Sequence, residues 1–166
     1  MYQHLHFLTP ESYSIQANSC TVSGGGGGSG TIDDVQTLYD NNWLIINEQN
    51  NGANPGFDIQ FNFIEVGRLY GVVFMGHHEL PANHDVNLLI YDFVNTQDEV
   101  ILNFKPSDYP NYRSIIYPHT VNTNQIDILG TAGNVRLTLQ HPDNGNNSHK
   151  FNLYYVALLG RRFKET

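Results

Sequence analysis

The chain has 166 residues, the usual length of one domain and long enough to bury a hydrophobic core. Its formal net charge is −8 at pH 7, and charged side chains make up only 14% of the residues. A surface of this charge repels the phosphates of nucleic acid, so we expect no nucleic-acid partner. No apolar run approaches the length of a membrane span, and the first residues lack the basic start of a signal peptide, so we expect no membrane association. The single cysteine, Cys20, excludes an internal disulfide.

The first 30 residues divide into two stretches. Residues 1–23 alternate weakly between apolar and polar side chains and predict an extended arm or the first short strands. Residues 24–30 read Gly-Gly-Gly-Gly-Gly-Ser-Gly and predict a flexible hinge, because ordering glycine costs the most backbone entropy; engineered linkers have the same composition. Side chains this apolar need a partner surface, so the arm is expected either to contact a neighbouring chain or to fold back onto its own sheet. The predicted contact residues are Tyr2, His4, Leu5, His6, Phe7 and Leu8.

Residues 31–160 are predicted to form the body, followed by a basic tail at 161–166. The clearest strand is the stretch 57–64, where apolar and polar side chains alternate with a period of two. Stretches near 88 and 137 repeat the pattern. Val35 and Leu38 could lie on a short helix, but we interpret 31–40 as a further strand, because the next strand follows at once. Roughly eight to ten strands joined by turns rich in Asn, Gly and Pro predict an all-β antiparallel β-sandwich of jelly-roll type. The predicted core contains Phe57, Ile59, Phe61, Phe63, Leu88, Ile90, Val135, Leu137 and Leu139.

The sequence contains no residue spacing that is typical of a metal site. The histidines of the body lack the helical spacing or the cysteine partners of zinc sites, so no metal and no cofactor is predicted; they are His77, His78, His84, His119, His141 and His149. Several carboxylates could meet at one end of a sandwich and bind Ca²⁺, but there is no EF-hand loop and we interpret them as solvated turn residues. They are Asp33, Asp34, Asp40, Glu48 and Asp58.

Catalytic motifs are also missing. The glutamates are scattered, and there is no Gly-x-Ser-x-Gly elbow, so we expect that the protein is not an enzyme. Trp43, Tyr109 and Tyr112 are candidate ligand-contacting aromatics, because aromatic faces stack on the C–H groups of sugars. The alternative for these side chains is packing in the core or at an interface.

The body resembles small bacteriophage structural proteins with a jelly-roll fold. The stretches that carry the resemblance are 34–40 (Asp-Val-Gln-Thr-Leu-Tyr-Asp), 57–63, 84–95, 135–139 and 154–158. The resemblance implies a capsid cement or decoration protein that stabilises the outer capsid surface by clamping neighbouring major capsid proteins. Its partners would be the major capsid protein and itself, as a dimer or trimer, on a virion assembled after synthesis in the host cytoplasm. The alternative is a carbohydrate-binding receptor-recognition domain of a tail fibre or adhesin, and a third, weaker one is a small glycan-acting enzyme.

Overall fold

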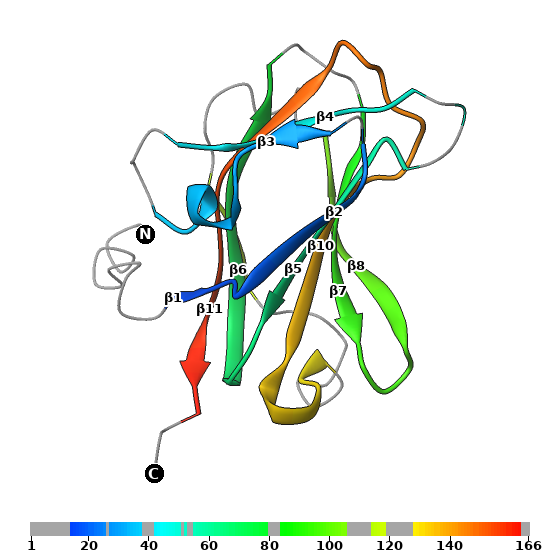
Figure 1. The fold of residues 1–166 in the computed structure, drawn as a ribbon. Coiled ribbons are helices and arrows are strands. Elements are labelled where there is room, and N and C mark those ends of the chain that lie inside the picture. Colours follow the sequence, from blue (N-terminus) through cyan, green and yellow to red (C-terminus); the bar gives the residue numbers. More distant parts are fainter. Residues whose placement is uncertain are drawn as a thin grey trace, which may run out of the picture.

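A computed structural model describes residues 14–25, 27–37, 42–50, 52, 55–79, 84–105, 114–118 and 128–163. These ranges contain eleven strands and two short 3₁₀ helices, η2 (Ile32–Val35) and η4 (Thr131–Gly133). None of the helices in these ranges is long and apolar enough to cross a membrane. The predicted fold class is confirmed, because the strands form two antiparallel sheets that pack as a sandwich of jelly-roll type (Figure 1).

The first sheet has the order β3-β4-β11-β6-β9, and β1 also pairs with β11. Its strands are β1 (Ser14–Gln16), β3 (Gly28–Ser29), β4 (Leu44–Asn47), β6 (Val66–His78), β9 (Ser114–Pro118) and β11 (Lys150–Arg162). The second sheet has the order β2-β5-β10-β7-β8. Its strands are β2 (Ser19–Gly24), β5 (Phe57–Phe63), β7 (Val86–Asp92), β8 (Gln97–Phe104) and β10 (Val135–His141).

The core lies between the two sheets and is organised around β5. This strand pairs with β10 in a register that places Phe61 opposite Leu137. All four alternating apolar residues of β5 are fully buried, as are the other predicted core residues on β7 and β10. Across the core, the ring of Phe57 stacks on that of Phe151 in β11, with the ring centroids 5.3 Å apart. The period-two pattern therefore identified the buried face of the second sheet correctly.

Residues 14–24 belong to the sandwich. β1 pairs with β11 in the first sheet, and β2 pairs with β5 in the second. Part of the glycine run is also a strand, since β3 pairs with β4. A Cβ atom at Gly28 would lie 1.9 Å from the carbonyl oxygen of Ile45, so only glycine allows this close approach of the backbones. The structure thus differs from the expected flexible hinge: Gly28 is packed against a neighbouring strand.

The strand predicted at residues 31–40 is wrong over residues 31–37, the part of it that the structure describes. Residues 32–35 form the 3₁₀ helix η2, because the carboxylate of Asp34 accepts hydrogen bonds from both the backbone N–H and the hydroxyl of Thr31. The bond from the Thr31 N–H to the Asp34 side chain belongs to a capping box, in which the third residue of a helix binds back to the residue that precedes it.

The end of β6 and the start of β7, like the end of β10 and the start of β11, lie at the upper end of the sandwich in Figure 1, close to β4. The residues at the ends of these strands therefore approach one another although they are far apart in the sequence.

Candidate functional site

Glu48 and four histidines meet at this end of the sandwich. We call Glu48, His78, His84, His141 and His149 the histidine cluster. The Glu48 carboxylate lies 3.2 Å from His84 Nδ1, 3.5 Å from His149 Nδ1, 3.6 Å from His78 Nδ1 and 4.0 Å from His141 Nε2. The rings of His84 and His141 stack, with their centroids 4.5 Å apart. One carboxylate is thus surrounded by imidazoles from both sheets.

Strand ends place these side chains. Glu48 directly follows β4, His78 ends β6 and His141 ends β10, while His84 and His149 shortly precede β7 and β11. A backbone hydrogen bond of 3.0 Å from Glu48 N–H to the His149 carbonyl joins two of these segments. The backbone N–H of Asn146 donates to Glu48 Oε2 at 2.8 Å and fixes the carboxylate.

The histidine cluster is largely buried. The Glu48 side chain is 0% exposed, while those of His149 and His84 are 16% and 28% exposed. Burial lowers the pKa of His78 to about 4, although the Glu48 carboxylate acts in the opposite direction. Burial also lowers the pKa of His141. Both rings are therefore neutral at neutral pH, the form in which imidazole binds metal ions.

The sequence interpretation missed this cluster. Its residues have no local spacing typical of a metal site, because five separate segments contribute one side chain each. One signal was present: two turn-rich loops, 78–84 and 141–149, both begin and end with histidine. Each loop joins two strands, so its first and last residues lie at the strand ends. When both loops lie at the same end of the sandwich, the four histidines come close together.

A second feature lies on the outer face of the first sheet. Trp43, which precedes β4, contacts Tyr154 of β11 edge-on, with the ring centroids 5.2 Å apart. The ring of His77 in β6 is nearly parallel to that of Tyr154, at 5.4 Å. We call Trp43, His77 and Tyr154 the aromatic platform. Trp43 is 37% exposed, so this group of rings reaches the surface.

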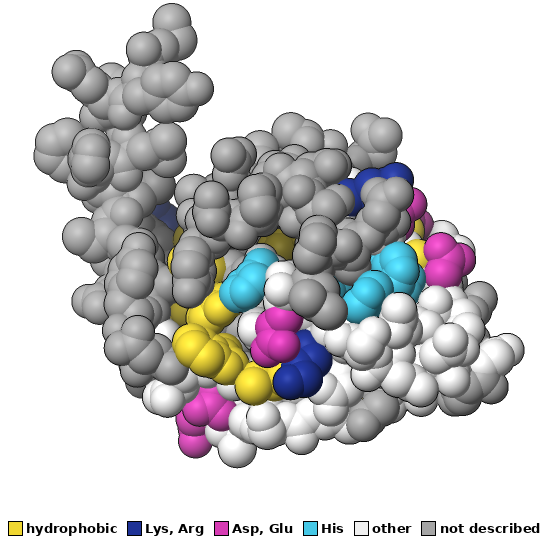
Figure 2. Space-filling model, turned by 90° about the horizontal axis from the view of Figure 1, so that it is seen from above, with side chains coloured by type: hydrophobic (Ala, Val, Ile, Leu, Met, Phe, Trp, Pro, Cys, Tyr) yellow, Lys and Arg dark blue, Asp and Glu magenta, His cyan; other side chains and the backbone are white. Residues whose placement is uncertain are grey.

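Polar side chains adjoin the platform. Asn152 is the β-sheet partner of His77, and its amide donates to Glu79 Oε1 at 3.4 Å. Lys150 and Glu79 form an ion pair of 3.6 Å. Figure 2 looks onto the upper end of the sandwich in Figure 1. It shows hydrophobic, histidine and charged side chains next to one another at the surface. The platform therefore combines aromatic rings with groups that form hydrogen bonds.

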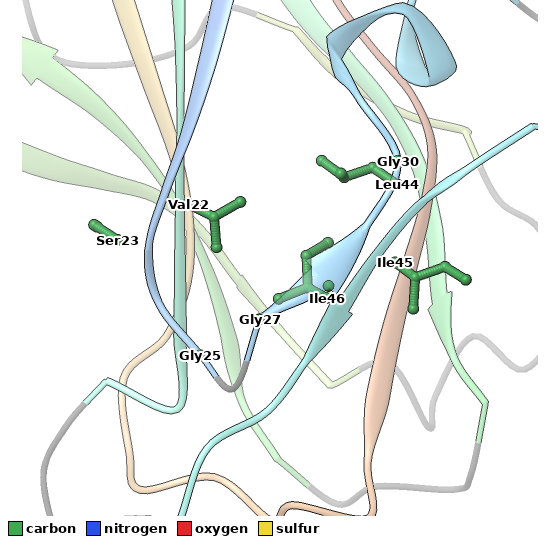
Figure 3. Close-up of a pocket in the computed structure, with 9 residues that line it drawn as sticks. Val22, Ser23, Gly25, Gly27, Gly30, Leu44, Ile45 and Ile46 are labelled. Carbon is green, nitrogen blue, oxygen red and sulfur yellow. The ribbon is translucent and has the colours of Figure 1, made fainter.

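A groove of about 350 Å³ runs between β2 and β4 (Figure 3). Val22, Leu44 and Ile46 line it together with glycines of the run at 24–30. Its lining contains neither an aromatic nor a charged side chain, so it offers few of the polar groups that orient a ligand.

Most of the other predicted site residues lie outside the part of the chain that the structure describes. The six predicted contact residues of the arm, together with Tyr109 and Tyr112, lie outside the described residues, as do His119 and Asp40. Among the carboxylates considered for Ca²⁺, Asp34 caps η2, and Asp58 accepts hydrogen bonds from Ser23 and Gln140. Glu48 instead lies in the histidine cluster, so these three carboxylates have different partners.

No protein-family model and no curated protein matches the chain. Solved structures of carbohydrate-binding modules do match its fold. One is TmCBM61 in complex with β-1,4-galactotriose, which is 11% identical, with 92% of this chain and 94% of that chain covered and a TM-score of 0.53. A mutant family 29 module is 16% identical, with 84% and 90% covered and a TM-score of 0.51. A second family 29 mutant, complexed with cellulohexaose, is 14% identical, with 85% and 92% covered and a TM-score of 0.50. At these identities the likeness shows a shared fold.

These matches correct the function implied by the resemblance to phage proteins. The inferred capsid cement function is wrong, because the three solved structures named above, which share the fold, are carbohydrate-binding modules and not capsid or decoration proteins. The resemblance rested on strand patterns, which many β-sandwiches share. The expected virion location and the expected dimer or trimer stay untested predictions.

Proposed function

We propose that this protein is a carbohydrate-binding module that recognises oligosaccharides at the aromatic platform without transforming them. The observation that carries the proposal is the placement of Trp43, the only tryptophan of the chain, at the surface beside Tyr154 and His77. Large aromatic side chains contribute most to binding when they are held rigidly by their neighbours. The edge contact with Tyr154 holds Trp43 in this way.

The chemistry of the platform suits a sugar. A pyranose ring has apolar C–H faces and a rim of hydroxyl groups, so it needs aromatic faces and hydrogen-bonding groups side by side. The rings of Trp43 and Tyr154 supply the aromatic surface. The Glu79 carboxylate accepts and the Lys150 ammonium donates hydrogen bonds, and both side chains are more than 40% exposed.

The fold supports the same proposal. Similar folds occur in modules solved with β-1,4-galactotriose and with cellulohexaose. We therefore expect the ligand to be an oligosaccharide of this kind, and these two compounds are the first to test.

Binding to a glycan array, followed by calorimetry on each glycan that binds, tests the proposal. We expect Trp43→Ala to weaken binding at least about tenfold, which corresponds to about 1.4 kcal/mol. Phe163→Ala is the matched control, because Phe163 is an exposed aromatic at the opposite end of β11 and should leave affinity unchanged. Failure of the wild-type protein to bind any glycan contradicts the proposal. Equal affinity of Trp43→Ala and the wild type contradicts the platform as the binding site.

A further inference from the structure

The histidine cluster contains buried polar atoms that the folded chain leaves without hydrogen bonds. His78 Nδ1 and Nε2, His141 Nε2 and His149 Nδ1 are all buried and unpartnered among the described residues. An unpaired buried polar atom costs free energy, and folded proteins rarely retain several together. His78 and His141 are themselves more than nine-tenths buried, and both face the carboxylate of Glu48. A cation held between these side chains would bind His149 Nδ1 and the Glu48 carboxylate directly, and His78 and His141 line the same buried space.

We propose that the histidine cluster binds a divalent transition-metal ion of the zinc class, with Glu48, His84 and His149 as its protein ligands. Their three ligand atoms lie within 4.8 Å of one another. The proposal does not rest on carbohydrate binding, because the cluster points into the end of the sandwich whereas the aromatic platform lies on the outer face.

The distances fit such an ion. Two ligand atoms on a tetrahedral zinc ion are about 3.3 Å apart when each bond is about 2.0–2.1 Å long. His84 Nδ1 and His149 Nδ1 lie 3.2 Å and 3.5 Å from Glu48 Oε2. Small rotations of the three side chains therefore bring them around one ion.

The donor set selects the type of metal. Imidazole nitrogen suits zinc, copper, iron and nickel, whereas Ca²⁺ and Mg²⁺ take oxygen ligands. The described residues within ion-pair distance of Glu48 are all histidines, so a bound cation would also neutralise this fully buried carboxylate. Three protein ligands leave one of the four usual positions of zinc to a further ligand.

Neighbouring groups hold the ligands in place. Asn146 N–H donates to Glu48 Oε2, and the ring of His141, whose Nδ1 lies 3.2 Å from the Asp85 carbonyl oxygen, stacks on His84. Such outer groups orient metal ligands in known sites. The ligands come from segments next to β4, β7 and β11, which belong to both sheets. A bound ion would therefore tie the two sheets together at this end and stabilise the folded state.

The test uses the full chain without an affinity tag, stripped with a chelator and titrated with Zn²⁺ by calorimetry and thermal unfolding. We expect one Zn²⁺ per chain and a rise in Tm of roughly 5–10 °C at a metal concentration about 100 times Kd. His84→Ala and His149→Ala should each weaken binding at least about 100-fold, since even outer groups contribute 10–100-fold. His77→Ala is the matched control, because His77 is adjacent to His78 in β6 but lies on the outer face; its affinity should equal that of the wild type.

Two results would overturn the proposal. One is the absence of stoichiometric Zn²⁺ binding by the wild type, which would make the cluster a polar network only. The other is wild-type affinity in both ligand variants. If a variant fails to fold, thermal unfolding of the wild type still tests the proposal. Zn²⁺ should raise its Tm, and Ca²⁺ at the same concentration should not. Equal effects of the two ions would contradict a site with nitrogen ligands.

Discussion

Replacement of Phe61 by alanine probes the core on which both candidate sites depend. Phe61 is fully buried in β5, the strand between β2 and β10, and lies opposite Cys20 on one side and Leu137 on the other. Its neighbours belong to paired strands and cannot collapse into the space left by the ring. The variant therefore loses both the burial of the ring and the contacts around the new cavity, about 3–5 kcal/mol in total.

Urea unfolding followed by far-UV circular dichroism measures this loss. We expect the midpoint to fall while the slope of the transition stays constant, and Tm to fall by roughly 6–20 °C. Val100→Ala in β8 is the control, because Val100 is 55% exposed and should change the free energy of unfolding by less than about 0.5 kcal/mol. A loss below about 1 kcal/mol for Phe61→Ala would refute the packing described here.

Two further predictions concern the glycine run and the turn after β7. Gly28→Ala should destabilise the fold by about 1–3 kcal/mol, because the added Cβ overlaps the Ile45 carbonyl oxygen; an unchanged urea midpoint would show that β3 does not pack as described. Hydrogen bonds from Asn95 and the backbone N–H of Val94 lower the pKa of Asp92. The unfolded chain then binds a proton more readily than the folded one, so this contribution to stability is present above about pH 3.9 and is lost as the pH falls through the folded pKa. The stability difference between the wild type and Asp92→Asn should therefore stay constant down to about pH 3.9 and shrink below it, and a constant difference in urea midpoints at lower pH would contradict the assignment.

The parts of the structure that follow from local chemistry could be predicted from the sequence. The alternation in β5 identified its buried face because a strand exposes its two faces in turn. The helix η2 was missed because one side-chain contact, from Thr31 to Asp34, outweighs the weak alternation around it. Gly28 was assigned to a hinge because composition does not reveal that a backbone approaches it closely.

The histidine cluster could not be predicted from spacing. Glu48 and Asn146 are 98 positions apart, and only the strand order brings the two segments together. The aromatic platform is similar, since His77 and Tyr154 lie on the paired strands β6 and β11, and Trp43 directly precedes β4, the other neighbour of β11. Trp43 was recognised as a candidate ligand contact, but its partners depend on topology.

Tryptophan fluorescence during an oligosaccharide titration tests whether the sugar binds at the aromatic platform. Trp43 is the only tryptophan, so its emission reports on the aromatic platform alone. With a glycan that binds by calorimetry, we expect a saturable change in emission whose midpoint matches the calorimetric Kd. Unchanged emission over a titration in which calorimetry shows binding would place the sugar elsewhere and contradict binding at the aromatic platform.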